Sequence, residues 1–398
     1  MEEIKWQILG HLWETSKDDV RRSLQIMQDK EAEARSYYSE VINMKSRRFA
    51  EMLLLDGYFI IQLFTPCEKM AEELRDLLDN SVYLQSSLHR DLLLLENQLP
   101  YFIFNVLLSV LDIQEVSSVA IQRVFIIKLD MKLPGLMVPS EDSKMAHLLD
   151  LLHQSIASPN PRVEWVIGLI METSGPQSLQ QSRSRSRCPL SLQFLQRSGS
   201  RPPSPVGVPS ATELVEAGVK IKVRKEGNFL DISFDKENGL LEIPAIRVQD
   251  STNLIFRNLI ALEQFNTDFG MKITCYSIFM DSIIDTEKDV ALLRQEGIIC
   301  CRHVNDKDIA LLFNELCKDI IFVASQNYFD LLCMEVNDYC NSRWNRWRAR
   351  LMRDYFSNPW AILSVIAAAV LLVLTILQTV FSVLSYTRQI HSSDKPHQ

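Results

Sequence analysis

The sequence predicts an α+β protein with a mainly helical body, a small antiparallel β-hairpin or meander, and one C-terminal transmembrane helix. Three observations predict this class. Apolar residues recur at helical spacing before residue 173 and again after residue 250. Apolar and polar residues alternate in short runs between residues 219 and 243, which is the spacing of strands. An uncharged apolar run fills residues 360–386.

Residues 1–173 are predicted to form the helical part of the body. The run at 49–64 is apolar on nearly all sides, so we expect a core helix there, whereas its neighbours show a polar face. Leu99-Pro100 separates the two halves of this part, because proline suits the first position of a helix. The other helices are expected at 4–13, 18–29, 31–44, 68–88, 101–111, 143–155 and 163–171.

Residues 174–209 have the composition of a flexible linker. They are rich in Ser, Arg, Pro, Gly and Gln and hold few large apolar side chains, so they cannot bury enough surface to fold. A phosphate in this segment would change its charge and its choice of partner. An unmodified solvated loop is the alternative. The candidate phosphorylation sites are Ser182, Ser184, Ser186 and Ser204.

Residues 210–340 are predicted to complete the body with a β-meander and further helices. Alternation over 219–224 and 230–234 flanks a turn at Gly227-Asn228, which indicates a hairpin, and 240–243 reads as a third strand. Three short strands need helices to cover their apolar face. Those helices are expected at 251–265, 276–285, 286–295 with Thr286 as N-cap, 306–320 and 326–347.

Residues 360–386 are long enough to cross a membrane. At 1.5 Å per residue a helix of this length reaches about 40 Å, against a hydrocarbon core of about 30 Å. A buried core helix is the alternative, but soluble helices of this length usually show a polar face. We therefore expect a transmembrane helix followed by a short tail, 387–398.

Residues 341–359 are predicted to form a basic, aromatic juxtamembrane helix. Its arginines outnumber the basic residues of the tail, so the positive-inside rule places the body in the cytosol. The membrane is expected to be the plasma membrane or an endomembrane. The aromatic residues share one helical face that suits the headgroup region, and packing on the body is the alternative. The predicted membrane-interface residues are Arg343, Trp344, Arg346, Trp347, Arg348, Arg350, Arg353, Trp360 and Tyr386.

Composition narrows the classes of function. The chain has 398 residues, 47% of them hydrophobic, so it can bury a sizeable core in one large or two ordinary domains. A net charge of -8, with no basic stripe away from the membrane flank, argues against nucleic acid as a partner. The eight cysteines form no CxxC pair and no Cys/His ligand spacing, so we expect reduced thiols and neither a metal nor a cofactor.

Acidic residues in apolar surroundings are the strongest candidates for chemistry. Asp91, Glu96 and Glu263 are predicted to form a buried polar site, where paired carboxylates with raised pKa values would serve as acid and base. The alternative is that they satisfy backbone groups at helix ends. His147 and His153 are six residues apart and do not share a helical face, which argues against a metal site.

Several blocks of sequence carry a family resemblance. Taken in order, these blocks resemble a plant family known as domain of unknown function 247. The resemblance extends over nearly the whole of this chain. Relatives usually carry a further segment ahead of the region that matches residue 1, and many have a more compact middle. The blocks are LLLDGYFIIQLF at 53–64, DLLLLENQLPYFIFNVL at 91–107, HLLDLL at 147–152, PSATELVEAGVKIK at 209–222, IPAIRVQDSTNLIFRNLIALEQ at 243–264, FMDSIIDTEKDVALLRQEGII at 279–299 and NPWAILS at 358–364.

This resemblance implies a mostly helical, C-terminally anchored plant protein whose biochemical activity is unassigned. Some grass relatives are implicated in pollen–pistil self-incompatibility, which implies recognition or signalling. Locations in such a family include the outer face of the plasma membrane, the reverse of the orientation that the arginines predict. Two hypotheses of function follow: a membrane-tethered interaction module with an unidentified protein partner, or a membrane-tethered enzyme with a carboxylate-based site.

Overall fold

The structure is a computed structural model of the whole chain. It describes residues 2–64, 82–111, 125, 136, 139, 144–157, 207–301, 304–318, 320–322, 327–342 and 359–393. The predicted helix at 163–171, most of the helix at 68–88, nearly all of the linker at 174–209 and most of the juxtamembrane helix at 341–359 lie outside these residues.

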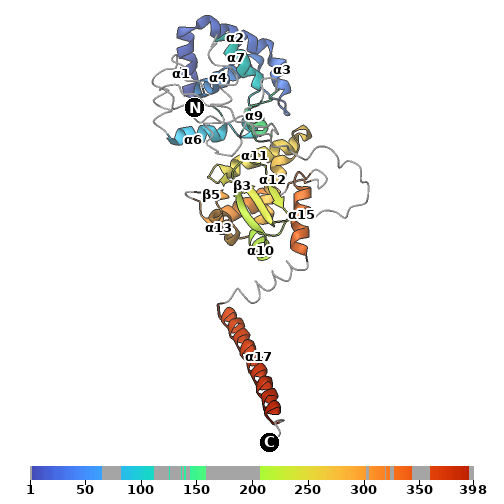
Figure 1. Cartoon of the computed structure of the whole chain (residues 1–398). Helices are drawn as coiled ribbons and strands as arrows, with labels where there is room; N and C mark the ends of the chain where they lie inside the picture. The colour runs from blue at the N-terminus through green and yellow to red at the C-terminus, as the bar shows by residue number, and fades with distance from the viewer. Residues whose placement is uncertain are drawn as a thin grey trace, which may run out of the picture.

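The first part of the chain is helical, as the sequence predicts (Figure 1). Its central element is α4 (Ser46–Phe64), which packs against α1, α2 and α7 and buries apolar side chains on most sides. The prediction of a core helix at 49–64 is therefore confirmed. The other elements are α1 (Glu2–Thr15), α2 (Lys17–Asp29), α3 (Glu31–Ser36), α6 (Val82–Asp91), η1 (Leu95–Asn97), α7 (Tyr101–Val110) and α9 (Leu148–Ala157).

Helix α3 ends before the predicted boundary at residue 44, because the Arg35 side chain binds the backbone carbonyls that follow the helix. The guanidinium of Arg35 donates to the carbonyl oxygens of Ile42 at 2.8 Å and Met44 at 2.7 Å. These two carbonyls would otherwise accept from amides in the next turn of a continued helix. Glu31 accepts from Arg35 Nε at 2.7 Å and fixes the guanidinium in place. The chain therefore folds back towards α4.

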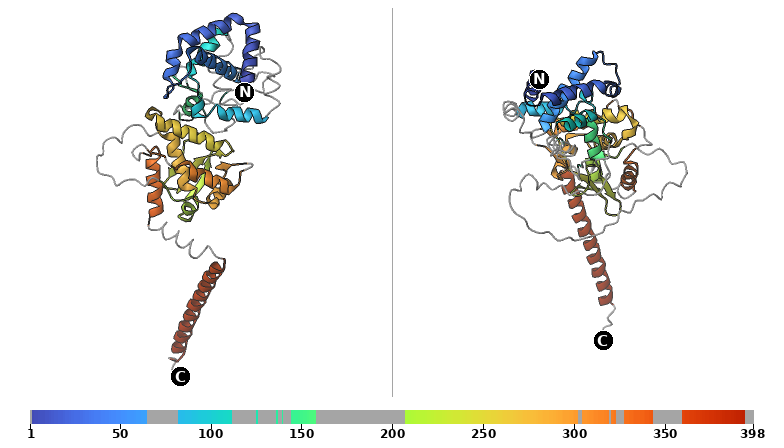
Figure 2. Two further views of the ribbon diagram at one scale, coloured as in Figure 1. Left: turned by 180° about the vertical axis from the view of Figure 1, so that it is seen from behind. Right: turned by 90° about the horizontal axis from the view of Figure 1, so that it is seen from above.

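The second part combines a small sheet with helices. Helix α11 lies between the N-terminal helices and the three-stranded sheet (Figures 1 and 2). One hydrophobic cluster contains buried residues from both parts, so the body has a continuous core. The elements are α10 (Ala211–Glu216), β1 (Lys220–Arg224), β2 (Ser233–Asp235), β3 (Leu240–Pro244), β4 (Ile246–Arg247), α11 (Thr252–Phe265), η3 (Thr267–Phe269), α12 (Lys272–Ile283), α13 (Glu287–Gln295), β5 (Ile299–Cys300), α14 (Asp306–Leu316) and α15 (Asp330–Asn341).

The sheet is mixed, which corrects the predicted antiparallel hairpin. The α+β class is confirmed, and the first and third strands lie where predicted. The second, expected over 230–234, is shorter and begins at Ser233, and the strand order is β1-β3-β2. β3 lies in the centre, parallel to β1 and antiparallel to β2. A separate parallel pair, β4 with β5, was not predicted.

The physical reason is that the chain after β1 enters the core instead of turning back along it. Phe229 and Leu230 are both buried, which breaks the in-and-out alternation of a strand. Phe229 packs against Phe256 and Tyr276, with ring centroids 6.1 Å and 4.2 Å away. The Asp231 carboxylate accepts from the Asn228 amide at 2.6 Å and closes this loop. The edge of β1 is thereby left for β3.

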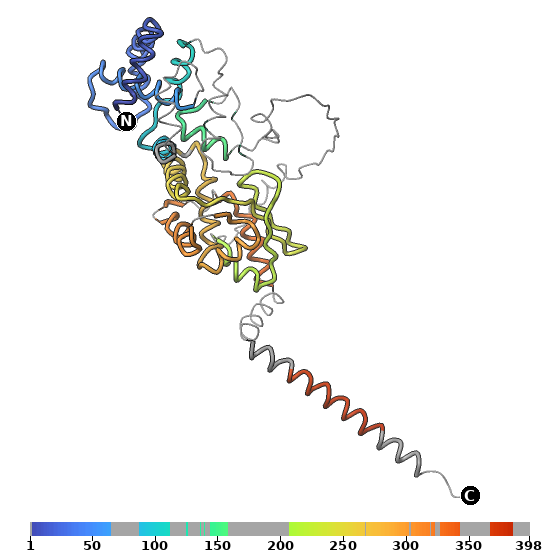
Figure 3. Tube along the Cα trace, turned by 90° about the vertical axis from the view of Figure 1, so that its left-hand side faces the viewer, coloured from blue at the N-terminus to red at the C-terminus, as the bar shows by residue number. Residues whose placement is uncertain are grey.

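Helix α17 (Pro359–Ser393) contains the predicted span at 360–386 and lies apart from the body (Figure 3). Its window Ala367–Leu384 has a mean hydropathy of 2.4, and 0% of the window is buried. A core helix of a soluble protein would be mostly buried. The helix is long and apolar enough to cross a membrane.

Candidate functional site

The three acidic residues of the predicted buried polar site do not come together. Glu263 on α11 is 2% exposed, whereas Asp91 at the end of α6 and Glu96 in η1 are both exposed. The prediction is therefore wrong for Asp91 and Glu96. Their carboxylates are left in solvent because Asn97 and Gln98 satisfy the backbone of this turn instead.

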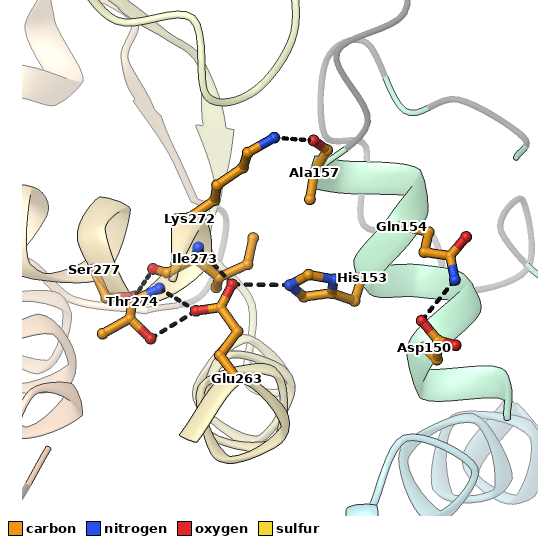
Figure 4. A network of polar contacts seen from close by, with 9 residues as sticks. All are labelled: Asp150, His153, Gln154, Ala157, Glu263, Lys272, Ile273, Thr274 and Ser277. Carbon is orange, nitrogen blue, oxygen red and sulfur yellow. Dashed lines mark hydrogen bonds and ion pairs between the residues drawn. The ribbon is translucent and has the colours of Figure 1, made fainter. Parts of the chain in front are cut away.

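Glu263 is held in a closed set of hydrogen bonds (Figure 4). Its Oε1 accepts from the Ile273 amide at 2.9 Å and lies 2.8 Å from His153 Nε2. Its Oε2 accepts from the Thr274 amide at 2.8 Å and from the Thr274 hydroxyl at 2.6 Å. Because a carboxylate only accepts, His153 is the donor to it.

These contacts make Glu263 the cap of a neighbouring helix. Ile273 and Thr274 lie in the first turn of α12, where backbone amides have no partner within their own helix. Met271, the N-cap residue of α12, makes no side-chain cap. A carboxylate at this end also interacts favourably with the helix dipole. Glu263 therefore fixes the N-terminus of α12 against α11.

The same junction satisfies the C-terminus of α9. Lys272 Nζ donates to the Ala157 carbonyl at 2.6 Å, and Asn228 Nδ2 donates to the Ile156 carbonyl at 3.1 Å (Figure 4 shows the first). Together with His153, these bonds join α9 to the second part of the body. We call His153, Glu263, Lys272 and Thr274 the junction cluster.

Among the described residues, the junction cluster is closed to solvent. The side chains of His153 and Glu263 are 3% and 0% exposed. Each Glu263 oxygen already accepts two hydrogen bonds, so no lone pair points to an unfilled space. This arrangement favours the helix-end alternative over acid/base chemistry at Glu263.

The start of α9 is also fixed by side chains. Gln98 Oε1 accepts from the Leu149 amide at 3.0 Å, while Gln98 Nε2 donates to the Leu92 and Leu94 carbonyls. His147 Nδ1 accepts from the Asp150 amide at 3.0 Å, and burial lowers the pKa of His147. His147 thus serves the start of α9, whereas His153, in the middle of the helix, contacts Glu263. No group of three His, Cys, Asp or Glu residues in the described parts of the chain could hold a metal ion.

Asp289 performs a similar task between α10 and α13, and sequence reasoning missed it. Its Oδ1 accepts from the amide and hydroxyl of Thr212, both at 2.8 Å, and its Oδ2 accepts from the amide and hydroxyl of Thr286, both at 2.9 Å. Burial would raise the pKa of Asp289, but these hydrogen bonds outweigh burial and hold the pKa below its usual value. The signal was Thr286-x-x-Asp289, a capping-box spacing. The prediction of Thr286 as N-cap is confirmed.

The DGYF stretch of α4 contacts three other helices. Asp56 pairs with Lys5 of α1 at 2.6 Å, and the Tyr58 hydroxyl is 2.7 Å from the Ser23 hydroxyl of α2. At Gly57 an added Cβ would overlap Leu107 of α7. Any larger residue here would have to displace the Leu107 side chain, so glycine lets α7 pack closely on α4.

The other predicted site residues lie outside the described side chains. Trp360 and Tyr386 fall in α17, where the backbone alone is described at those positions. The rest are outside the described residues altogether: Arg343, Trp344, Arg346, Trp347, Arg348, Arg350, Arg353, Ser182, Ser184, Ser186 and Ser204.

Comparison with known families identifies the chain. The model of the family DUF247, described as a plant protein of unknown function, matches residues 1–374. The chain belongs to the DUF247 family. The UPF0481 protein At3g47200 of Arabidopsis thaliana is 29% identical over 384 residues, which covers 94% of this chain and 76% of that protein. A second Arabidopsis thaliana UPF0481 protein, At3g02645, is 34% identical over 171 residues, 43% of this chain and 32% of that protein. No solved structure matches.

The sequence blocks that resemble DUF247 proteins coincide with contacts between elements. DGYF joins α4 to its neighbours, LLENQLP holds the start of α9, and the Thr of SATEL bonds Asp289. In FRNLIALEQ, Asn258 accepts from the Leu95 amide at 2.8 Å and Glu263 caps α12. These polar residues of the DUF247 blocks, Asp56, Gln98, Thr212, Asn258 and Glu263, thus join one element to another.

Proposed function

We propose that this DUF247 protein is held in a membrane by α17 and that its body is a protein-interaction module. The observation that carries the proposal is the window Ala367–Leu384, with a mean hydropathy of 2.4 and 0% of it buried. In water this helix would expose a continuous apolar surface, which costs free energy in proportion to its area. In a bilayer the same side chains face hydrocarbon, and the helix satisfies its own backbone groups.

The closed junction cluster supports an interaction role over the carboxylate-based enzyme. An acid/base site needs titratable groups that face a space where a substrate can bind. Glu263 faces only its four hydrogen-bond donors, and Asp91 and Glu96 are on the surface elsewhere. The polar side chains that join its helices keep the shape of the body fixed. A body of fixed shape is suited to presenting a surface to partners.

Proximity labelling in plant cells tests the interaction role. The full chain, fused at its N-terminus to a labelling enzyme, is expected to mark a reproducible set of proteins. The matched control carries the same enzyme on residues 343–398 with the body removed, so that both fusions sample the same membrane. Identical labelling by the two fusions would contradict an interaction role for the body.

The arginines between Arg343 and Arg353 support a cytosolic body. The chain contains no Asn-x-Ser/Thr site of its own, so engineered glycosylation sites give a clean readout. An acceptor in an extension after Gln398 should be glycosylated, and an acceptor ahead of Met1 should not. The reverse result would place the body outside the cytosol and favour extracellular recognition.

A further inference from the structure

An apolar groove of about 280 Å³ opens on the surface between α1, α2 and α4. Helix α1 supplies one wall, with Trp6, Gly10 and Trp13, and the floor comes from α2 and α4. The floor residues include Val20, Leu24 and Leu54. The groove is remote in sequence from the junction cluster and shares no residue with it.

The wall on α1 is a stripe along one helical face. Trp6, Gly10 and Trp13 are spaced by four and three residues, so they follow one another along the helix. The indole side chains remain exposed, Trp6 by 53% and Trp13 by 41%. A Cβ added at Gly10 would meet nothing within 4 Å. The missing side chain therefore leaves an open notch between two tryptophans.

The fold does not need this stripe for its core. Helix α1 is attached through a different face, where Ile8 and Leu12 are buried and Lys5 pairs with Asp56 at 2.6 Å. Two exposed tryptophans beside an apolar floor are unusual for a surface that faces only water, since such patches mark interaction sites. Tryptophan is also the residue type most enriched among binding hot spots.

The charges around the groove specify its occupant. Lys17 Nζ lies 5.1 Å and the Arg21 guanidinium carbon 5.5 Å from the centroid of the Trp13 ring. Arg21 also lies 3.8 Å from the Asp18 carboxylate, so two positive charges and one negative charge leave this end of the groove with a net positive charge. Glu51, the acidic residue among the described lining residues, pairs with Arg47 at 3.0 Å. An acidic group is therefore the complementary partner for the Trp13 end.

We propose that the groove binds an amphipathic helical segment of a partner protein, with an apolar side chain in the Gly10 notch and an acidic residue opposite Lys17 and Arg21. The stripe from Trp6 to Trp13 spans about two helical turns, or roughly 10 Å, which matches apolar anchors on successive turns of a bound helix. This inference rests on the proposed interaction role of the body and assigns that role to one surface.

The test uses the full chain in nanodiscs of uncharged lipid and a displayed library of amphipathic helical peptides with randomised flanking charges. Peptides selected by the natural chain are expected to carry Asp or Glu at one end. Gly10→Leu fills the notch and is expected to weaken their binding by about tenfold or more. The paired change Lys17→Glu with Arg21→Glu should shift selection towards Lys- and Arg-bearing peptides.

Gly10→Ala is the matched control, because it adds a single methyl group at the same position. It should retain most of the peptide binding. Both Gly10 variants should melt no earlier than the natural chain, since glycine in a helix interior is unfavourable and the space is empty. Loss of binding in Gly10→Leu is then attributable to the filled notch and not to unfolding.

Three results would overturn the proposal. Equal peptide affinities of the natural chain and Gly10→Leu would show that the notch takes no part in peptide binding. Self-association that Gly10→Leu abolishes would make the groove a contact between two copies. Binding to anionic vesicles that Gly10→Leu abolishes would assign it to lipid. If body-specific proximity labelling persists in Gly10→Leu, the groove is not the binding surface, while the interaction role of the body stands. If the body adds no labelling in the natural chain, the interaction role itself is contradicted.

Discussion

Glu263 shows how one buried carboxylate can organise a junction. It accepts one hydrogen bond from His153, one from Ile273 and two from Thr274. Its partner His153 is 110 residues away in the sequence, on a helix from the first part of the body. Removing the carboxylate would leave buried amides without an acceptor, and unsatisfied buried donors are costly.

We expect Glu263→Gln to lower the free energy of unfolding by about 1–3 kcal/mol, because an amide offers one acceptor oxygen where the carboxylate offers two. Glu96→Gln is the matched control, since Glu96 is exposed and should change stability by less than about 0.5 kcal/mol. Urea unfolding of the full chain in detergent measures both. Equal effects of the two substitutions would contradict the capping role of Glu263.

Asp289 predicts a pH dependence. Its folded pKa lies below the ordinary value of 3.8, so the ionised carboxylate stabilises the fold fully above that pH, and this stabilisation is lost as the pH falls through the folded pKa. Asp289→Asn lacks the titrating group. We expect the stability difference between the natural chain and Asp289→Asn to be constant near neutral pH and to shrink below about pH 4. Urea midpoints across a pH series measure it; a difference that stays constant into strong acid would contradict it.

For single residues, burial could be predicted from the sequence in some cases and not in others. Glu263 could be predicted as buried because apolar residues surround it, and Thr286 because it begins an amphipathic run. Asp91 and Glu96 also have apolar neighbours along the chain, but their turn directs them to solvent. The pairing of His153 with Glu263 joins two distant helices, so nothing local in the sequence predicts it.

Elements were predicted better than their pairings. Alternation located β1 and β3 and came near β2, because burial on one face of a strand is a local property. Strand order depends on where the intervening chain goes, and burial of Phe229 against Tyr276 sends it into the core. Helix α3 likewise ends early through a side-chain contact from Arg35 that no helical spacing reveals.

Gly57 tests the close packing of α4 on α7. A Cβ there would overlap Leu107 and come within 3.3 Å of Ile103, and both residues are 0% exposed, so neither side chain has room to move. We expect Gly57→Ala to lower the free energy of unfolding by about 1–3 kcal/mol through overpacking. Gly10→Ala, where the space is open, should instead raise it by up to about 1 kcal/mol. Equal stability of the two variants would show that the helices separate without cost.

For the whole molecule, the sequence predicted a mainly helical body with a small sheet and a terminal apolar helix. It did not predict that α9, from the first part, and α12, from the second, meet end to end. The groove could not be predicted either. Trp6 and Trp13 are apolar residues on an amphipathic helix, and spacing alone would assign them to the core. Their exposure becomes visible only when α2 and α4 are placed beside α1.

Membrane residence through α17 is the central claim, and alkaline carbonate extraction tests it most directly. Membranes from plant cells expressing the full chain are compared with membranes from cells expressing a chain that ends at Asn358. The full chain should stay in the pellet, because a spanning helix of this length does not dissociate, whereas a basic interfacial segment binds reversibly. The shortened chain should be released into the supernatant. Retention of the shortened chain in the pellet, or release of the full chain, would contradict anchoring by α17.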